Sequence, residues 1–281
     1  MNKIHRHWFL AVGIKTVIPL PLKPKIIKKE KNKAVFEIEA LYPGYGVTIG
    51  NSLRRVLLSS LPGGAVTQMK IKGVLHEFST IPGVLEDVVT IMLNLKQLRF
   101  KVFSDEPQKA TLKVRGEREV KASDFEYPPQ VEIINKNAHI ATLTDKKAEL
   151  EMEVQIERGV GYLSRETRRE KRKPEIGVIW VDAIFTPIRK VATKIENMRV
   201  GERTDYDRLF LEIETDGTIE PQEAFKRASE ILKEHFEFLA KTFEEEKKET
   251  KKEKREEKKE EKKKKKETKK KGKKTVKKKS K

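Results

Sequence analysis

The residues of this chain that could do chemistry do not form a known catalytic pattern. Gly44, Gly46 and Gly50 suggest a phosphate-binding loop, but their spacing does not match the dinucleotide fingerprint. His76 and Glu77 lack the second histidine of a zinc-hydrolase motif, and no Ser-His-Asp or Cys-His arrangement is visible. The chain also has no Asp-x-Asp-x-Asp loop that could hold catalytic magnesium ions. We therefore expect no catalytic residue here.

Metal-ligating residues are equally sparse. The chain has no cysteine, which excludes disulfides and thiolate metal sites. Its histidines are scattered, and only His5 and His7 lie close enough in sequence to chelate an ion weakly. We expect neither a metal site nor a cofactor.

Charge is concentrated at the C-terminal end. The chain has 63 Lys+Arg against 44 Asp+Glu and a net charge of +19. Residues 244–281 hold 22 of the basic and 10 of the acidic residues, which leaves a mildly basic body. With one apolar residue, Val276, this tail cannot bury enough surface to fold alone. We expect it to be disordered, or a marginal solvated helix in its Glu-rich first part.

No apolar run is long enough to predict a membrane span. Residues 8–14 resemble the short apolar core of a signal peptide, but Lys15 interrupts the run and no small-x-small cleavage site follows. We therefore expect a cytoplasmic protein. Residues 1–17 are either an N-terminal extension or the product of a misassigned start codon.

Periodicity predicts an α+β body. Alternating apolar residues predict strands at 34–40, 110–114, 131–134, 140–143 and 209–215, and the alternation is most regular at 148–156. Residues 66–74 also look strand-like, and 177–185 indicate a strand buried on both faces. A helix is expected at about 82–98, with Glu86 and Asp87 in its first turn at the positive end of the helix dipole.

A short amphipathic helix is predicted at 46–60. Thr48 could cap its first turn, and Pro62-Gly63 cannot continue it. Its apolar stripe consists of Ile49, Leu53, Val56 and Leu57. Arg54 and Arg55 lie beside the stripe, where they are either a solvated edge or part of an interface.

A longer helix is predicted from Pro221 to about Phe243, because proline is tolerated at the first helical position. Helical spacing connects Phe225, Ala228, Leu232, Phe236, Leu239 and Phe243. This stripe is more apolar than a peripheral helix needs. It is buried either within one protomer or against a second copy.

Several short motifs stand out along the chain. The longest is Gly-Asn-Ser-Leu-Arg-Arg-Val-Leu-Leu-Ser-Ser at 50–60. After it come His-Glu-Phe-Ser-Thr at 76–80, Gly-Val-Leu-Glu-Asp at 83–87, Leu-Asn-Leu-Lys at 93–96, Arg-Gly-Val-Gly-Tyr at 158–162, Val-Asp-Ala at 181–183, Arg-Thr-Asp at 203–205 and Thr-Asp-Gly-Thr-Ile at 215–219. No single block is specific, but in this order across 18–243 they closely resemble one family, the α subunits of bacterial RNA polymerase.

The resemblance implies a specific domain organisation. A dimerisation subdomain is made of two separated segments, 18–62 and 177–243, and a mostly β insert subdomain, 63–176, interrupts it. In the family the first and last helices pack against those of a second copy. The resemblance therefore implies a dimer interface that contains the apolar stripes of both predicted helices.

The resemblance also implies a scaffold function. In the family, two α copies dimerise and bind the large β and β′ subunits, so that DNA-directed RNA polymerase, a nucleotidyltransferase active in transcription, can assemble. Arg55 and Lys96 match family positions at the contact with the β subunit, and a guanidinium suits such a contact because its planar fork holds carboxylates rigidly. Magnesium would be held by another subunit.

The chain departs from the family at its end. The lysine-rich tail stands where family members continue into a small domain that binds upstream DNA, so we expect only non-specific DNA binding through the tail. Two alternatives remain open. A basic-tailed dimeric protein that associates with nucleic acid or ribosomes would explain the tail but not the ordered motifs. An archaeal-type assembly subunit would share the dimerising half, but the insert lacks cysteines and looks bacterial.

Overall fold

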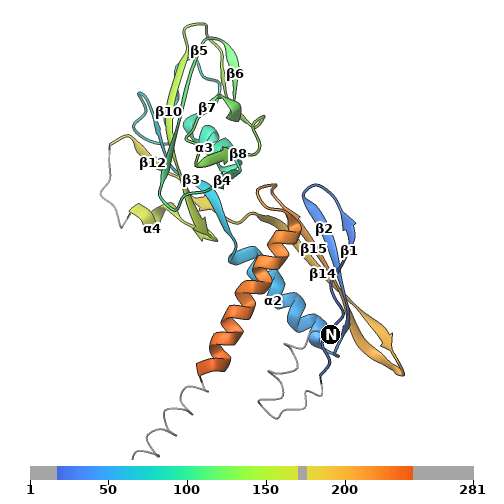
Figure 1. The fold of residues 1–281 in the computed structure, drawn as a ribbon. Coiled ribbons are helices and arrows are strands. Elements are labelled where there is room, and N and C mark those ends of the chain that lie inside the picture. Colours follow the sequence, from blue (N-terminus) through green and yellow to red (C-terminus); the bar gives the residue numbers. More distant parts are fainter. Residues whose placement is uncertain (1–17, 170–175, 243–281) are drawn as a thin grey trace, which may run out of the picture. The chain divides into compact units, whose positions relative to one another are not determined.

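The structure, a computed structural model, describes residues 18–169 and 176–242 (Figure 1). The predicted extension 1–17, the basic tail 244–281 and Phe243 lie outside the described residues. The described chain combines antiparallel sheets with a few helices, which confirms the α+β class.

One sheet has four strands in the order β1-β2-β15-β14, and therefore joins the two ends of the described chain. Its strands are β1 (Lys25–Lys29), β2 (Lys33–Leu41), β14 (Ile188–Val200) and β15 (Arg203–Thr215). Alternate residues of β2 and β15 are buried. Helix α2 (Tyr45–Ser59) covers β14 and β15.

A larger sheet of seven strands forms the middle of the chain, in the order β7-β5-β10-β3-β4-β8 with β12 paired to β3. Its strands are β3 (Pro62–Ile71), β4 (Phe100–Val102), β5 (Gln108–Arg115), β7 (Phe125–Glu126), β8 (Val131–Ile133), β10 (Glu149–Val160) and β12 (Val178–Trp180). The remaining elements are α3 (Val88–Lys96), β6 (Arg118–Lys121), the 3-10 turn η1 (Ala122–Asp124), β9 (His139–Leu143), β11 (Tyr162–Leu163), α4 (Arg165–Arg169) and β13 (Ala183–Ile184).

Strict alternation along β10 explains the two faces of this sheet. One face buries the apolar residues Leu150, Met152, Val154 and Ile156 in the core. The other face carries carboxylates that pair with cations on the neighbouring strand. Lys109 lies 2.7 Å from Glu153, for example. The strand predicted at 148–156 is confirmed.

Several predicted boundaries are wrong because turn geometry and capping groups were misassigned. Helix α2 begins at Tyr45 after Gly44, so Thr48 lies inside the helix and does not cap it. Helix α3 begins only at Val88, because Asp87 is its N-cap and accepts a hydrogen bond from the backbone N–H of Thr90. Residues 82–87 are therefore not helical.

Strand predictions failed where alternation is absent. Residues 177–185 form two short strands, β12 and β13, rather than one, and these pair with different partners. Strands β1, β4, β6, β7, β11 and β14 were not predicted. β14 lies at a sheet edge, and its apolar residues do not alternate.

The last described element is a helix that spans residues 221–242, which confirms the prediction of a helix from Pro221. Its first part, through Ser229, belongs to the same compact unit as both sheets. Residues from Glu230 onward form a separate unit, which is described by itself.

Candidate interaction surfaces

A carboxylate from β15 fixes the N-terminus of α2. Oδ2 of Asp207 accepts hydrogen bonds from the backbone N–H groups of Gly44 and Gly46, each 2.9 Å long. Asp207 is only 7% exposed, and its charge lies at the positive end of the helix dipole. Position 46 must be glycine, because a Cβ there would lie 2.9 Å from Asp207. The sheet therefore sets the placement of α2.

Anchored in this way, α2 presents two arginines to solvent. Leu53 and Leu57 are buried beneath the helix, whereas Arg54 and Arg55 on its outer side are exposed. Within the described residues, neither guanidinium has an ion-pair partner. Two uncompensated arginines on a rigid helix are well suited to hold carboxylates of another chain.

Lys96, the second predicted contact residue, is already paired within the chain. Its Nζ lies 3.6 Å from Oδ2 of Asp182, and its side chain is 25% exposed. The backbone N–H of Arg165 donates to the same carboxylate at 3.0 Å. This hydrogen bond first, and Lys96 second, hold the pKa of Asp182 below its usual value against the effect of burial. Lys96 and Arg55 lie on different helices and share no partner.

Sequence reasoning missed the segment that leads from β3 to α3 as a surface. Leu75, Phe78 and Leu85 are all strongly exposed there. Nη1 of Arg165 lies 3.1 Å from Oε1 of Glu77, which ties this segment to α4. The segment contains the His-Glu-Phe-Ser-Thr motif, so an aromatic residue in a polar loop was the available signal.

The first part of the C-terminal helix packs onto the four-stranded sheet. The ring of Phe225 stacks on Phe36 with centroids 4.9 Å apart, and Ala228 is fully buried. Ile49 of α2 packs against the same apolar cluster as Phe225. Of the predicted interface residues, the structure therefore brings these two together, inside one protomer.

The other predicted interface residues divide into two groups. Leu53 and Leu57 are buried within the protomer, so they support α2 and do not present a free surface, and Val56 is half-buried. In the second unit, Leu232 is half-buried, whereas Phe236 and Leu239 are 61% and 57% exposed. Phe238, which the predicted stripe omits, is exposed as well.

The described residues contain no group of three or more His, Cys, Asp or Glu side chains that could hold a metal ion. Over the same residues, no helix combines the length and apolar character needed to cross a membrane.

Comparison with known proteins gives one consistent result. Residues 69–186 match the family model for the RNA polymerase Rpb3/RpoA insert domain. The chain is 52% identical over 217 residues to the DNA-directed RNA polymerase subunit alpha of Symbiobacterium thermophilum, a match that covers 76% of this chain and 68% of that protein. The proteins of the same name from Syntrophomonas wolfei and Roseiflexus sp. are 51% and 48% identical, and these matches cover 68% and 65% of the relatives.

Proposed function

The chain belongs to the family of bacterial DNA-directed RNA polymerase α subunits, and from this premise we propose that two copies dimerise and hold the β and β′ subunits during assembly. The comparisons support the polymerase interpretation rather than that of a nucleic-acid- or ribosome-associated protein. Nucleotidyl transfer and its magnesium ions would belong to the other subunits.

The observation that carries this proposal is the exposed arginine pair of α2, for which residues 18–169 and 176–242 supply no ion-pair partner. Arg55 is the proposed anchor for the β subunit, since α2 is held rigidly by Asp207 and exposes this guanidinium. Lys96 would contribute indirectly, because its ammonium group already binds Asp182.

Dimerisation is proposed through the C-terminal helix. Phe236 and Leu239 are too exposed to stabilise an isolated protomer, and large exposed side chains at helical spacing are typical of a surface that a partner covers. The proposal keeps a dimerisation subdomain made of residues 18–62 and 177–243, and an insert subdomain made of residues 63–176. The insert-domain match over 69–186 supports the second of them.

We also propose that residues 244–281 bind DNA without sequence preference. Lysine point charges neutralise phosphates but do not read base edges, so this binding should weaken steeply with added salt. A cytoplasmic location fits the same assembly.

Co-expression of the full chain with the β subunit tests the proposal. Arg55→Ala should weaken capture of β about 30-fold, because losing a desolvated interface arginine costs roughly 2 kcal/mol. Arg115→Ala is the matched control, since Arg115 is an exposed arginine on the insert that pairs with Glu149. Sedimentation should show a dimer for both variants.

Three results would each contradict one part of the proposal. Unchanged β affinity in Arg55→Ala would show that the arginine is only a solvated edge. A wild-type monomer at micromolar concentration would contradict dimerisation. An intact dimer in Leu232→Glu, where a charge enters the proposed apolar interface, would contradict the assignment of the interface to the C-terminal helix.

A further inference from the structure

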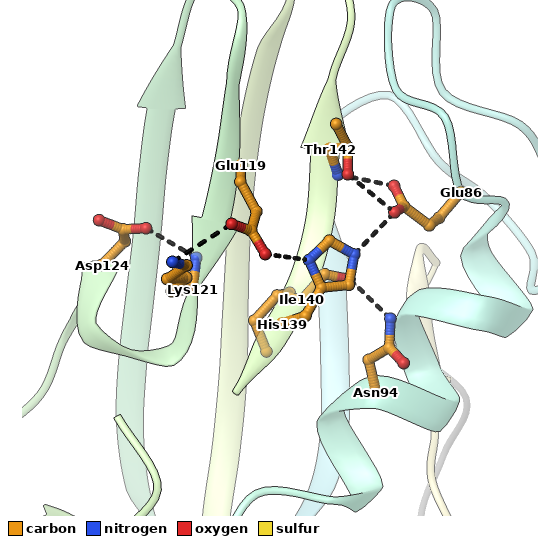
Figure 2. A network of polar contacts seen from close by, with 8 residues as sticks. All are labelled: Glu86, Asn94, Glu119, Lys121, Asp124, His139, Ile140 and Thr142. Atoms are coloured by element: carbon orange, nitrogen blue, oxygen red, sulfur yellow. Dashed lines mark hydrogen bonds and ion pairs between the residues drawn. The ribbon is translucent and has the colours of Figure 1, made fainter. Parts of the chain in front are cut away.

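The imidazole ring of His139 lies between two carboxylates (Figure 2). Its Nε2 is 2.8 Å from Oε1 of Glu86, which precedes α3, and its Nδ1 is 3.1 Å from Oε1 of Glu119 on β6. A single side chain of β9 therefore links two other segments of the insert.

The two carboxylates are held with different firmness. The side chain of Glu86 is 11% exposed and accepts hydrogen bonds from both the backbone N–H and the hydroxyl of Thr142. Glu119 is 50% exposed, and its second oxygen lies 3.2 Å from Nζ of Lys121. Burial, the largest influence, raises the pKa of Glu86, but these hydrogen bonds together bring it below its usual value. Lys121 first, and the ring second, lower the pKa of Glu119.

The contacts of His139 with Glu86 and Glu119 depend on how many protons the imidazole ring carries. Imidazolium has two N–H groups and can donate to both carboxylates, whereas neutral imidazole has one. A neutral ring must therefore turn a lone pair toward one carboxylate. The contact with Glu119 is the weaker of the two, because Glu86 is buried and fixed by Thr142.

The other groups around the ring are already engaged. Asp124 of η1 accepts from the backbone N–H of Lys121 and pairs with Arg118 at 2.6 Å. Asn94 of α3 carries no charge and donates to the carbonyl of Ile140. The ring and its two carboxylates are therefore the groups whose charges change the contact between β6 and β9.

We propose that His139 is a proton-dependent clasp. The imidazolium ties both β6 and the segment before α3 to β9, and the neutral ring keeps Glu86 and releases Glu119. Strand β6 is short and pairs with β9 alone, and the register shifts beside Lys121, opposite His139. A two-stranded pair of this size depends on side-chain contacts, so release of Glu119 loosens β6. The clasp is closed while the ring carries both N–H protons, and it opens when the ring loses one of them.

Nuclear magnetic resonance of the full chain tests the clasp. Ring-nitrogen signals of His139 and exchange protection of the β6 amides are followed from about pH 5 to about pH 9, with protection corrected for intrinsic exchange. His76 is the internal reference, since its Nδ1 contacts the hydroxyl of Ser79. The ring should pass from two N–H groups to Nε2–H alone, and β6 protection should fall about tenfold with loss of one charge-assisted hydrogen bond.

Three variants separate the clasp from general effects of pH. Glu119→Gln should abolish the pH dependence of β6 protection, and His139→Gln should hold β6 at its high-pH level throughout. Glu132→Gln, an exposed carboxylate on β8, should behave like the wild type. The proposal is overturned by equal wild-type protection at low and high pH, by an Nδ1–H tautomer at high pH, or by a tenfold fall that persists in Glu119→Gln.

Discussion

Asp207→Ala should destabilise the protein strongly, because one carboxylate accepts two backbone hydrogen bonds at the start of α2. The substitution leaves the backbone N–H groups of Gly44 and Gly46 without their carboxylate acceptor at the start of α2, where Gly46 is buried. Each hydrogen bond to a charged group contributes about 1.5–3 kcal/mol, and the two share one carboxylate, so the expected loss is roughly 3 kcal/mol. Asp207→Asn keeps an acceptor oxygen but not the charge, and should lose about half as much.

Thermal unfolding followed by circular dichroism measures this effect, at one protein concentration because dimerisation would otherwise shift the midpoint. At about 2–4 °C per kcal/mol for a chain of this size, Asp207→Ala should lower the Tm by roughly 6–12 °C. Asp205→Ala is the control on the same strand. Asp205 is exposed and pairs with the exposed Arg203, so its loss should cost little.

Gly46→Ala tests the same contact between Asp207 and the N-terminus of α2 by changing the helix instead of the carboxylate. Its Cβ would lie 2.9 Å from both Cβ and Oδ2 of Asp207, so either the carboxylate or the helix must move. The Tm of Gly46→Ala should therefore be close to that of Asp207→Ala. A Tm for Asp207→Ala within about 1 °C of the Asp205→Ala value would refute the reasoning, because α2 would then not depend on this cap.

Two further predictions follow from the packing and the charges. Phe225→Ala should lower the free energy of unfolding by about 2–3 kcal/mol, because it removes a ring that stacks on Phe36, and urea unfolding measures this loss. Phe236→Ala should leave the stability of the protomer unchanged and weaken dimerisation, because Phe236 is exposed, and sedimentation measures this effect. Asp182 has a depressed pKa, so its contribution is present above the unfolded value of about 3.9 and is lost as pH falls through the folded value. The difference in unfolding free energy between wild type and Asp182→Asn should therefore be constant above about pH 5 and shrink toward pH 3, and an unchanging difference would contradict the assignment.

Sequence patterns predicted the structural features that depend on residues close together in the sequence. The apolar stripe of α2 and the alternation of β10 follow from local periodicity, and both are present in the structure. The cap of α2 could not be predicted in this way, because Asp207 follows Gly44 by 163 positions and only the pairing of β15 with β2 brings them together. Thr48 was the best local candidate.

The same limit applies to the candidate site. Motif resemblance singled out Lys96 and also the Val-Asp-Ala block that contains its partner Asp182, but no local pattern indicates that the two side chains pair, because Asp182 comes from a separate strand connection. β14 was not predicted because it lies at a sheet edge and its apolar residues follow no strict period of two. Exposure also divides the predicted interface residues in a way that periodicity cannot, since Leu57 and Leu239 both belong to predicted apolar stripes, yet Leu57 is buried and Leu239 is exposed.

The cap of α2 also has a consequence for the order of events during synthesis. The helix leaves the ribosome early, but its capping carboxylate and the strand that completes its sheet are made only when β15 emerges. The seven-stranded sheet between them, from β3 to β12, is contiguous and can complete its own pairing first. The arginines of α2 therefore reach their rigid, exposed position only after β15 has been made. The contact proposed for Arg55 depends in the same way on a strand that is translated long after the helix itself.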